Sequence, residues 1–198
     1  MNNDKQTRIQ ELETTIQERI QSICDNEDCE EVNFDDVLCY MKKKNKYKAI
    51  DGKINGKYRF YTSSQEKVLF RDDYEFENTH ILIGRGGVAS IHLTSKFSVT
   101  HDDVYVLSTK TSELDIKYIY NYIKINIGLI EQSFKGSTIK HSSKSALSKI
   151  KIKLPKNKKL IHDLNPMFKE IEEHQQAVKD ADDLYKKYIK ELSNEAMP

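Results

Sequence analysis

Apolar residues recur every three or four positions near both ends of the chain, and this period predicts two amphipathic helices. The first covers residues 4–24, with Asp4 as its N-cap. Its apolar positions are Ile9, Leu12, Ile16, Ile20 and Ile23. The second covers residues 164–192 and is the longest regular pattern. Its heptad track contains Leu164, Phe168, Ile171, Val178, Tyr185 and Leu192, with Gln175 and Ala181 in the weaker layers.

A heptad seam of this length requires a partner, because a lone helix leaves it exposed to water. The partner is either the N-terminal helix of the same chain or a second subunit, and a third possibility is that the helix lies across its own domain. The sequence leaves these alternatives open. We assign the six heptad residues to dimerisation and expect a homodimer through helix 164–192.

Between the two helices the period changes. Residues 58–107 are short β-branched and aromatic runs separated by Ser, Asp, Asn and Gly, as in a compact β unit. Helical spacing returns over 115–127 behind Asp115, a short helix is expected within 142–150, and the alternating KIKIKL at 149–154 predicts a strand. We therefore predict an α+β fold with an N-terminal helix (1–24), a compact β-rich domain with a few helices (25–160) and a C-terminal coiled-coil-type helical segment (161–198).

The charge is unevenly distributed, although the formal net charge is only +1. Residues 25–36 contain seven acids and no Lys or Arg, whereas residues 42–59 contain eight Lys or Arg and one acid, Asp51. Residues 133–160 contain nine Lys and no acid. If folding brings the two basic stretches together, they form one positive face of the kind that binds nucleic acid. The alternative is that lysine is simply the common surface residue of this chain.

Several classes of site are excluded by the sequence. IGRGGVA matches GxGxxA at Gly84, Gly86 and Ala89, but VASIHLTSKF follows it and favours a strand where a dinucleotide fold needs a helix. The glycine run lacks the GK[ST] of a phosphate-binding loop, and the six histidines show no HxxxH or HExxH spacing. His101-Asp102-Asp103 is interpreted as a polar turn before a strand, in preference to a metal site. We predict no catalytic residues, no metal and no cofactor of the chain's own.

No apolar stretch is long enough to span a membrane, and the N-terminus shows no secretory signal. The chain has three cysteines, Cys24, Cys29 and Cys39, without a CxxC pair. An odd number of unpatterned cysteines favours reduced thiols in a cytoplasmic protein over a disulfide scaffold.

Four segments occur in a fixed order. They are GKYRFYTSSQ (56–65), ILIGRGGVASIHLTSKFSVTHDDVYVL (81–107), KGSTIKHSSKSALSKIKIKLP (135–155) and the heptad-bearing helix. This order resembles the target-recognition domain and adjoining spacer helix of type I restriction–modification specificity subunits. The resemblance covers about residues 30–192. Two positions depart from the family pattern: Phe60 stands where a proline is usual, and KLPKNKKLIHDLN replaces the usual entry to the spacer.

The resemblance implies a function. Specificity subunits of this family read double-stranded DNA and are not catalytic; they direct DNA methyltransferase (modification) and endonuclease subunits to a split target. S-adenosylmethionine would belong to the modification subunit. A complete member has two recognition domains and two spacer helices, whereas this chain has one of each, so it resembles a half-subunit. Two copies related by a two-fold axis would then read an inverted repeat.

The candidate DNA-binding residues lie in three turns, since base edges are read by side chains that project from a scaffold. The first turn supplies hydroxyls and an amide, the second a guanidinium beside small residues, and the third a polar basic loop. The alternatives are an ordinary serine-rich turn for the first and a structural salt bridge for Arg85. The candidates are Tyr61, Thr62, Ser63, Ser64 and Gln65; Arg85, Gly86 and Gly87; and Lys140, His141, Ser142, Ser143 and Lys144.

Two other functions compete with DNA recognition. The acidic run and near-zero net charge are also compatible with an interaction protein that docks on modification subunits through its helices, as a decoy or assembly regulator, without reading DNA. A nucleotide-binding enzyme based on the glycine cluster ranks last. Salt-dependent duplex binding separates the first alternative from DNA recognition.

Overall fold

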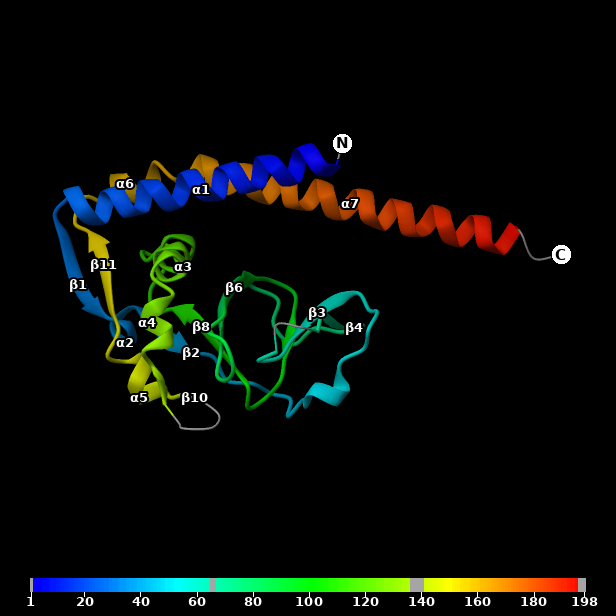
Figure 1. Ribbon diagram of the computed structural model, residues 1–198, viewed down its shortest axis with the longest axis horizontal. Helices are drawn as coiled ribbons and strands as arrows, with labels where there is room; N and C mark the ends of the chain where they lie inside the picture. The colour runs from blue at the N-terminus through cyan, green and yellow to red at the C-terminus, as the bar shows by residue number, and fades with distance from the viewer. Residues whose placement is uncertain (1, 65–66, 136–140, 196–198) are drawn as a thin grey trace. The chain divides into compact units, whose positions relative to one another are not determined.

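The computed structural model describes residues 2–64, 67–135 and 141–195. The fold is α+β, as the sequence predicts (Figure 1). The chain forms two compact units. Its two ends, up to Asn26 and from Asn157 onward, form a helical unit, and Glu27–Lys156 forms a β-rich unit.

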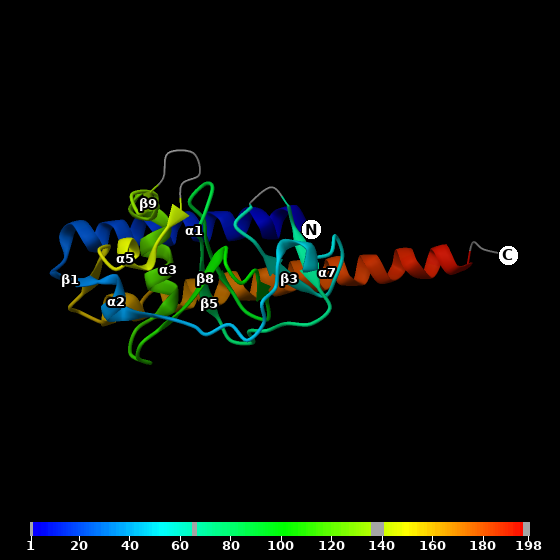
Figure 2. The same ribbon diagram turned by 90° about the horizontal axis from the view of Figure 1, so that it is seen from below.

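The helical unit pairs the two predicted long helices within one chain. Helix α1 (Asn2–Asn26) packs against helix α7 (Asn165–Glu195), which follows the short helix α6 (Lys159–His162). Both views show the two helices running antiparallel and side by side (Figures 1 and 2). Their buried positions are Leu12, Ile16, Ile20 and Ile23 on α1 and Leu164 and Phe168 on the α6–α7 side.

The strands that the structure describes in the β-rich unit are short and form four small sheets. The largest has the order β2-β8-β5-β6 and is antiparallel throughout. A second sheet has the order β4-β3-β7, in which β3 and β7 are parallel. The strands of these two sheets are β2 (Leu38–Tyr40), β3 (Tyr58–Tyr61), β4 (Leu69–Arg71), β5 (His80–Gly84), β6 (Ile91–Thr94), β7 (Ser98–Val99) and β8 (Val104–Thr109).

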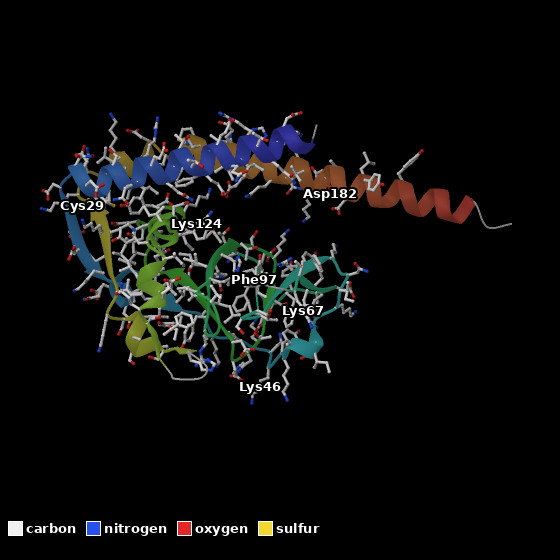
Figure 3. All side chains as sticks on the ribbon, viewed as in Figure 1. Cys29, Lys46, Lys67, Phe97, Lys124 and Asp182 are labelled. Atoms are coloured by element: carbon white, nitrogen blue, oxygen red, sulfur yellow. The ribbon has the colours of Figure 1, made fainter. Side chains whose placement is uncertain are left out.

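The core between these strands is aliphatic and aromatic. Strand β5 is buried along its whole length, which explains its continuous apolar run ILI. Phe97 lies in the interior of the unit (Figure 3) and stacks on Phe76 at 5.2 Å between ring centroids. The cluster consists of Phe76, Leu82, Phe97, Val99, Val104 and Val106, with Tyr61 packed against it.

Two helical predictions are confirmed with altered bounds. Helix α3 (Ile116–Ile125) begins behind Asp115, whose carboxylate accepts from the amides of Lys117 and Tyr118 at 2.8 and 3.0 Å. It ends before the predicted residue 127, because Asn126 leaves the helical conformation, and α4 (Gly128–Glu131) follows. Helix α5 (Lys144–Leu147) lies within the expected 142–150 segment, after the short hairpin of β9 (Phe134–Lys135) and β10 (His141–Ser142).

Part of the acidic run at 25–36 forms a strand. Residues Cys29–Asn33 form strand β1, which pairs antiparallel with the predicted basic strand β11 (Lys151–Pro155). Glu31 lies opposite Lys153, and an ion pair joins Asp28 to Lys156 at 2.9 Å. A short helix α2 (Phe34–Val37) follows β1. The pairing places acids beside part of the second basic stretch, so those lysines do not form a purely positive surface.

Candidate nucleic-acid interface

The turn after β5 is built for close packing. A Cβ atom on Gly84 would lie 2.4 Å from the Ser90 hydroxyl oxygen, so glycine permits the approach of the two sides of the turn. Gly87 has φ +78°, a conformation that glycine adopts without strain. The chain then enters strand β6 and not a helix, which agrees with the exclusion of a dinucleotide site.

The Arg85 backbone connects this turn to two others. Its amide donates to the Asp103 carbonyl at 2.8 Å, and its carbonyl accepts from the Ser142 amide at 2.8 Å. An isolated bridge joins Gly86 to His141. The second and third predicted turns, which are more than fifty residues apart in sequence, therefore lie side by side around Arg85.

The Arg85 side chain is oriented by neutral groups. Its Nη1 donates to the Asp102 carbonyl oxygen at 2.5 Å, and its guanidinium carbon lies 4.8 Å from the centre of the Tyr105 ring. Its Nε is buried without a hydrogen-bond partner among the described residues. In the described part of the chain no carboxylate forms an ion pair with this guanidinium, so its contacts differ from the structural salt bridge considered for Arg85.

Lys43 organises the turn that holds Arg85. Its ammonium donates to the Thr100 carbonyl at 3.1 Å and to the carbonyls of His101 and Val104. Burial, and then the nearby Arg85 guanidinium, lower the pKa of Lys43 to about 8. The side chain therefore still carries its proton at neutral pH and can donate all three bonds. The polar turn predicted at His101-Asp102-Asp103 is confirmed and directly precedes β8.

Two tyrosines support the cations of this region. The Tyr40 and Tyr105 rings meet edge to face at 5.3 Å, and the Lys144 ammonium lies 4.4 Å from the centre of the Tyr40 ring. Each positive group thus lies over an aromatic face, an arrangement that stabilises a cation without neutralising it. The Tyr40 hydroxyl is buried without a hydrogen-bond partner among the described residues, and burial raises its pKa.

The first predicted turn adjoins the same cluster. The Tyr61 carbonyl accepts from the Thr100 amide at 2.9 Å, while the Tyr61 ring packs 5.1 Å from His92. The Ser63 Cα lies 3.9 Å from the point that a Gly84 Cβ would occupy. The Thr62 hydroxyl accepts from the Ser64 amide at 3.1 Å and so shapes the turn itself. Gln65 lies outside the described residues.

In the third turn the polar residues have different roles. His141 and Ser143 are exposed, and the Ser143 hydroxyl accepts from the Ala146 amide at 3.2 Å as the N-cap of α5. Ser142 is buried, and its hydroxyl lies 2.7 Å from that of Ser133. Lys144 is exposed. Lys140 lies outside the described residues.

The structure brings together parts of all three predicted turns and adds residues that sequence analysis missed. Lys43, Tyr40 and Tyr105 carry no motif that could have identified them, because Lys43 is one of eight cations in its stretch and the tyrosines lie in ordinary strands. The assembled surface offers hydroxyls, cations, backbone groups and the exposed Asp102 carboxylate. Such a mixture of donors and acceptors suits the edges of base pairs.

Within residues 2–64, 67–135 and 141–195, no group of three or more His, Cys, Asp or Glu side chains is placed to hold a metal ion. Over the same residues, none of the helices combines the length and apolar character that a membrane crossing requires.

Comparison with known structures shows the fold. The chain is similar to the S subunit of a type I restriction-modification system from M. genitalium, at 21% identity and a TM-score of 0.61. The match covers 71% of this chain and 38% of that one, so the chain spans about two fifths of the length of that subunit. The HsdS subunit from Thermoanaerobacter tengcongensis aligns at 12% identity over 88% of this chain and 48% of that one, with a TM-score of 0.47.

Comparison with functionally curated proteins found no significant match. A family model, in contrast, matches residues 26–192, which is most of the chain and includes the whole β-rich unit, Glu27–Lys156. That model describes the type I restriction modification DNA specificity domain. The chain therefore belongs to the family of type I restriction–modification DNA specificity domains.

Proposed function

We propose that this chain recognises a specific sequence of double-stranded DNA as a half-subunit of a type I restriction–modification system. Its family is that of the non-catalytic specificity subunits. The observation that supports the proposal most is the convergence of the predicted turns around Arg85, where its backbone bonds reach both Asp103 and Ser142. A rigid cluster of this kind can present side chains to base edges in a fixed register.

The proposed partners follow from the family. The chain would direct DNA methyltransferase (modification) subunits to the target, and S-adenosylmethionine would be bound by those subunits. DNA contacts divide into two kinds. Exposed cations such as Lys144 contact phosphates, and the side chains nearest the Arg85 turn contact bases.

Selection from a random duplex library tests this function directly. The purified chain is mixed with the library at about 50 mM salt, where phosphate attraction is strong, and the retained duplexes are sequenced. We expect enrichment of a defined sequence. Retention without enrichment would mean that modification subunits are needed for sequence reading. Absence of retention would contradict the proposal.

A second function is favoured by one observation. Strand β1 brings Glu30 and Glu31 beside β11, and Asp28 pairs with Lys156, so part of the basic surface is neutralised. The chain could then dock on modification subunits as a decoy or assembly regulator without reading DNA. Such a protein would bind modification subunits in solution but show no salt-dependent affinity for duplex DNA.

We also propose that two copies associate through the far part of α7. The first part is already covered within the chain: Phe168 on α7 and Leu164 directly before it are buried, and Arg8 donates to Glu170 at 2.8 Å across the helix pair. In both views α7 continues beyond the start of α1 (Figures 1 and 2). Along this continuation Leu184, Tyr185 and Tyr188 are 69%, 65% and 57% exposed.

Of the heptad residues assigned to dimerisation, those in the first part of α7 are covered within the chain, and we propose that the exposed ones further along contact the second copy. Ile171 and Val178 are half-buried in the single chain, and Tyr185 is open to a partner. The side chain of Leu192 lies outside the described set. Dimerisation through the exposed residues would place two recognition units on a two-fold axis, which suits an inverted-repeat target.

Replacing Tyr185 and Tyr188 together with glutamate is expected to weaken self-association about a hundredfold or more. Both rings are exposed in the single chain, so the fold should be unchanged, whereas an apolar seam between copies would contain like charges. Sedimentation velocity across a concentration series measures the effect. Lys179→Glu, also exposed on α7, is the control. An unchanged association constant in the double variant would exclude this surface from the dimer.

A further inference from the structure

The segment between β2 and β3 exposes two isoleucines. Ile50 is 88% exposed and Ile54 is 81% exposed, the highest values among the large apolar side chains that the structure describes. They lie within residues 42–59, the stretch with eight cations and one acid. We call residues 42–57 the lysine loop. Part of it forms the short helix η1 (Ala49–Asp51).

The lysine loop is held in place by many contacts. The backbones of Lys53 and Phe70 exchange two hydrogen bonds, at 2.9 and 2.8 Å. Arg71 donates to the Asp51 carbonyl at 3.0 Å, and its guanidinium carbon lies 3.9 Å from the centre of the Tyr47 ring. These bonds fix the backbone after Ile50, and before it the Tyr47 carbonyl accepts from the His101 amide at 2.8 Å. The exposure of Ile50 is therefore a defined feature of the fold and does not follow from a loose loop.

Close packing at Gly52 fixes the remainder. A Cβ atom there would lie 2.6 Å from a ring carbon of Phe60 and 2.9 Å from a methyl carbon of Leu69. The glycine thus allows the loop backbone to lie directly on the β3–β4 side chains. Although the loop backbone packs on these side chains, Ile50 and Ile54 themselves remain exposed to solvent.

The surroundings of the two isoleucines contain more cations than acids, although Asp51, Asp72, Asp73 and Glu75 also contact residues of the loop. Lys42, Lys46 and Lys48 are exposed and form no ion pair with any residue in the described part of the chain. Lys53 pairs with Asp72 at 2.7 Å. Figure 3 shows Lys46 at the outer edge of the β-rich unit. The local excess of positive charge suits a polyanion.

The loop is also continuous with the candidate interface. Lys43, at its start, binds the carbonyls of Thr100, His101 and Val104, and the Tyr47 carbonyl accepts from the His101 amide at 2.8 Å. At its end, β3 leads to Tyr61 and the first predicted turn. The lysine loop and the candidate interface are therefore attached to the same turn, residues 100–104.

We propose that the lysine loop is a second DNA-binding element, in which Ile50 and Ile54 pack against sugars and base edges in a groove while Lys46 and Lys48 contact the flanking phosphates. The inference rests on the proposed function. Apolar side chains enter DNA grooves in many complexes and contact thymine methyl groups or base steps. The centres of protein–protein interfaces are depleted in lysine, so an apolar pair surrounded by lysines fits a modification subunit less well.

Two double variants test the proposal, Ile50→Ser with Ile54→Ser and Lys46→Ala with Lys48→Ala. Affinity for a duplex that carries the selected sequence is measured from about 50 mM to about 200 mM salt. The isoleucine variant should lose about tenfold or more in affinity at every salt concentration, with an unchanged salt slope, since apolar burial releases no counterions. The lysine variant should flatten the slope by about 1.8, or about 0.9 for each phosphate contact.

Three other outcomes would contradict the proposal, each in a different way. Wild-type affinity and slope in the isoleucine variant would exclude Ile50 and Ile54 from the DNA interface. If that variant instead failed to bind modification subunits, the loop would be a protein-docking surface. If the wild-type chain bound no duplex at any salt, the proposed function would fail and the inference with it. Because both residues are exposed, the fold should be retained, as circular dichroism can verify.

Discussion

Replacing Lys43 with methionine is expected to lower the free energy of unfolding of the protein by about 2–4 kcal/mol at neutral pH. The ammonium is the common donor to the carbonyls of Thr100, His101 and Val104, and methionine would leave all three acceptors without it in a partly buried position. The cost of such orphaned acceptors exceeds the gain from burying a thioether. Urea denaturation followed by circular dichroism measures the change.

Lys46→Met is the matched control for this prediction. Lys46 lies three residues away, is exposed and makes no described ion pair, so its replacement should change the free energy of unfolding by less than about 0.5 kcal/mol. Equal stability of the Lys43 and Lys46 variants would show that the carbonyl contacts contribute little. Because the turn at 100–104 also holds Arg85, we expect Lys43→Met to weaken DNA binding as well.

Replacing Arg85 with alanine is expected to lower affinity for the selected DNA sequence by about tenfold to a hundredfold and affinity for unrelated DNA much less. The guanidinium is oriented by Tyr105 and by the Asp102 carbonyl, and it forms no ion pair with a carboxylate among the described residues. An oriented guanidinium can donate two bonds to guanine. Competition binding with selected and scrambled duplexes gives the ratio of the two affinities.

Two further variants serve as controls for the effect of Arg85→Ala on sequence preference. Lys144→Ala removes an exposed cation, so it should weaken selected and scrambled DNA alike and reduce the salt slope by about 0.9. Arg85→Lys keeps the charge but loses the planar fork, and should behave like Arg85→Ala in sequence preference. If all the variants keep the wild-type ratio of affinities, the base-reading role of Arg85 is wrong.

The local elements followed from the sequence because their signals are local. The spacing of Ile16, Ile20 and Ile23, first four and then three residues, specifies a buried helix face whatever it packs on. Asp115 caps α3 through amides two and three residues away. Alternation in KIKIKL specifies a strand, although the sequence did not reveal that an acidic strand, β1, would pair with it. The α+β class follows from these periods.

The pairing of the heptad helix required the tertiary structure. The heptad pattern predicts that the helix packs against a partner, but its apolar seam fits α1 and a second copy equally well. The Arg8–Glu170 bond and the burial of Phe168 assign the first part of α7 to its own chain. The exposure of Tyr185 leaves the remainder for the proposed second copy.

The different roles of similar residues at the candidate interface also became visible only in the tertiary structure. In the sequence Lys43 and Lys46 are equivalent members of one basic run, yet one is bound to three backbone carbonyls and the other lies in solvent. Sequence period determines which face of an element is apolar, because that depends on neighbours a few residues away. It does not determine which turns meet, because those contacts join residues far apart in the chain and depend on the order of strands in the sheets.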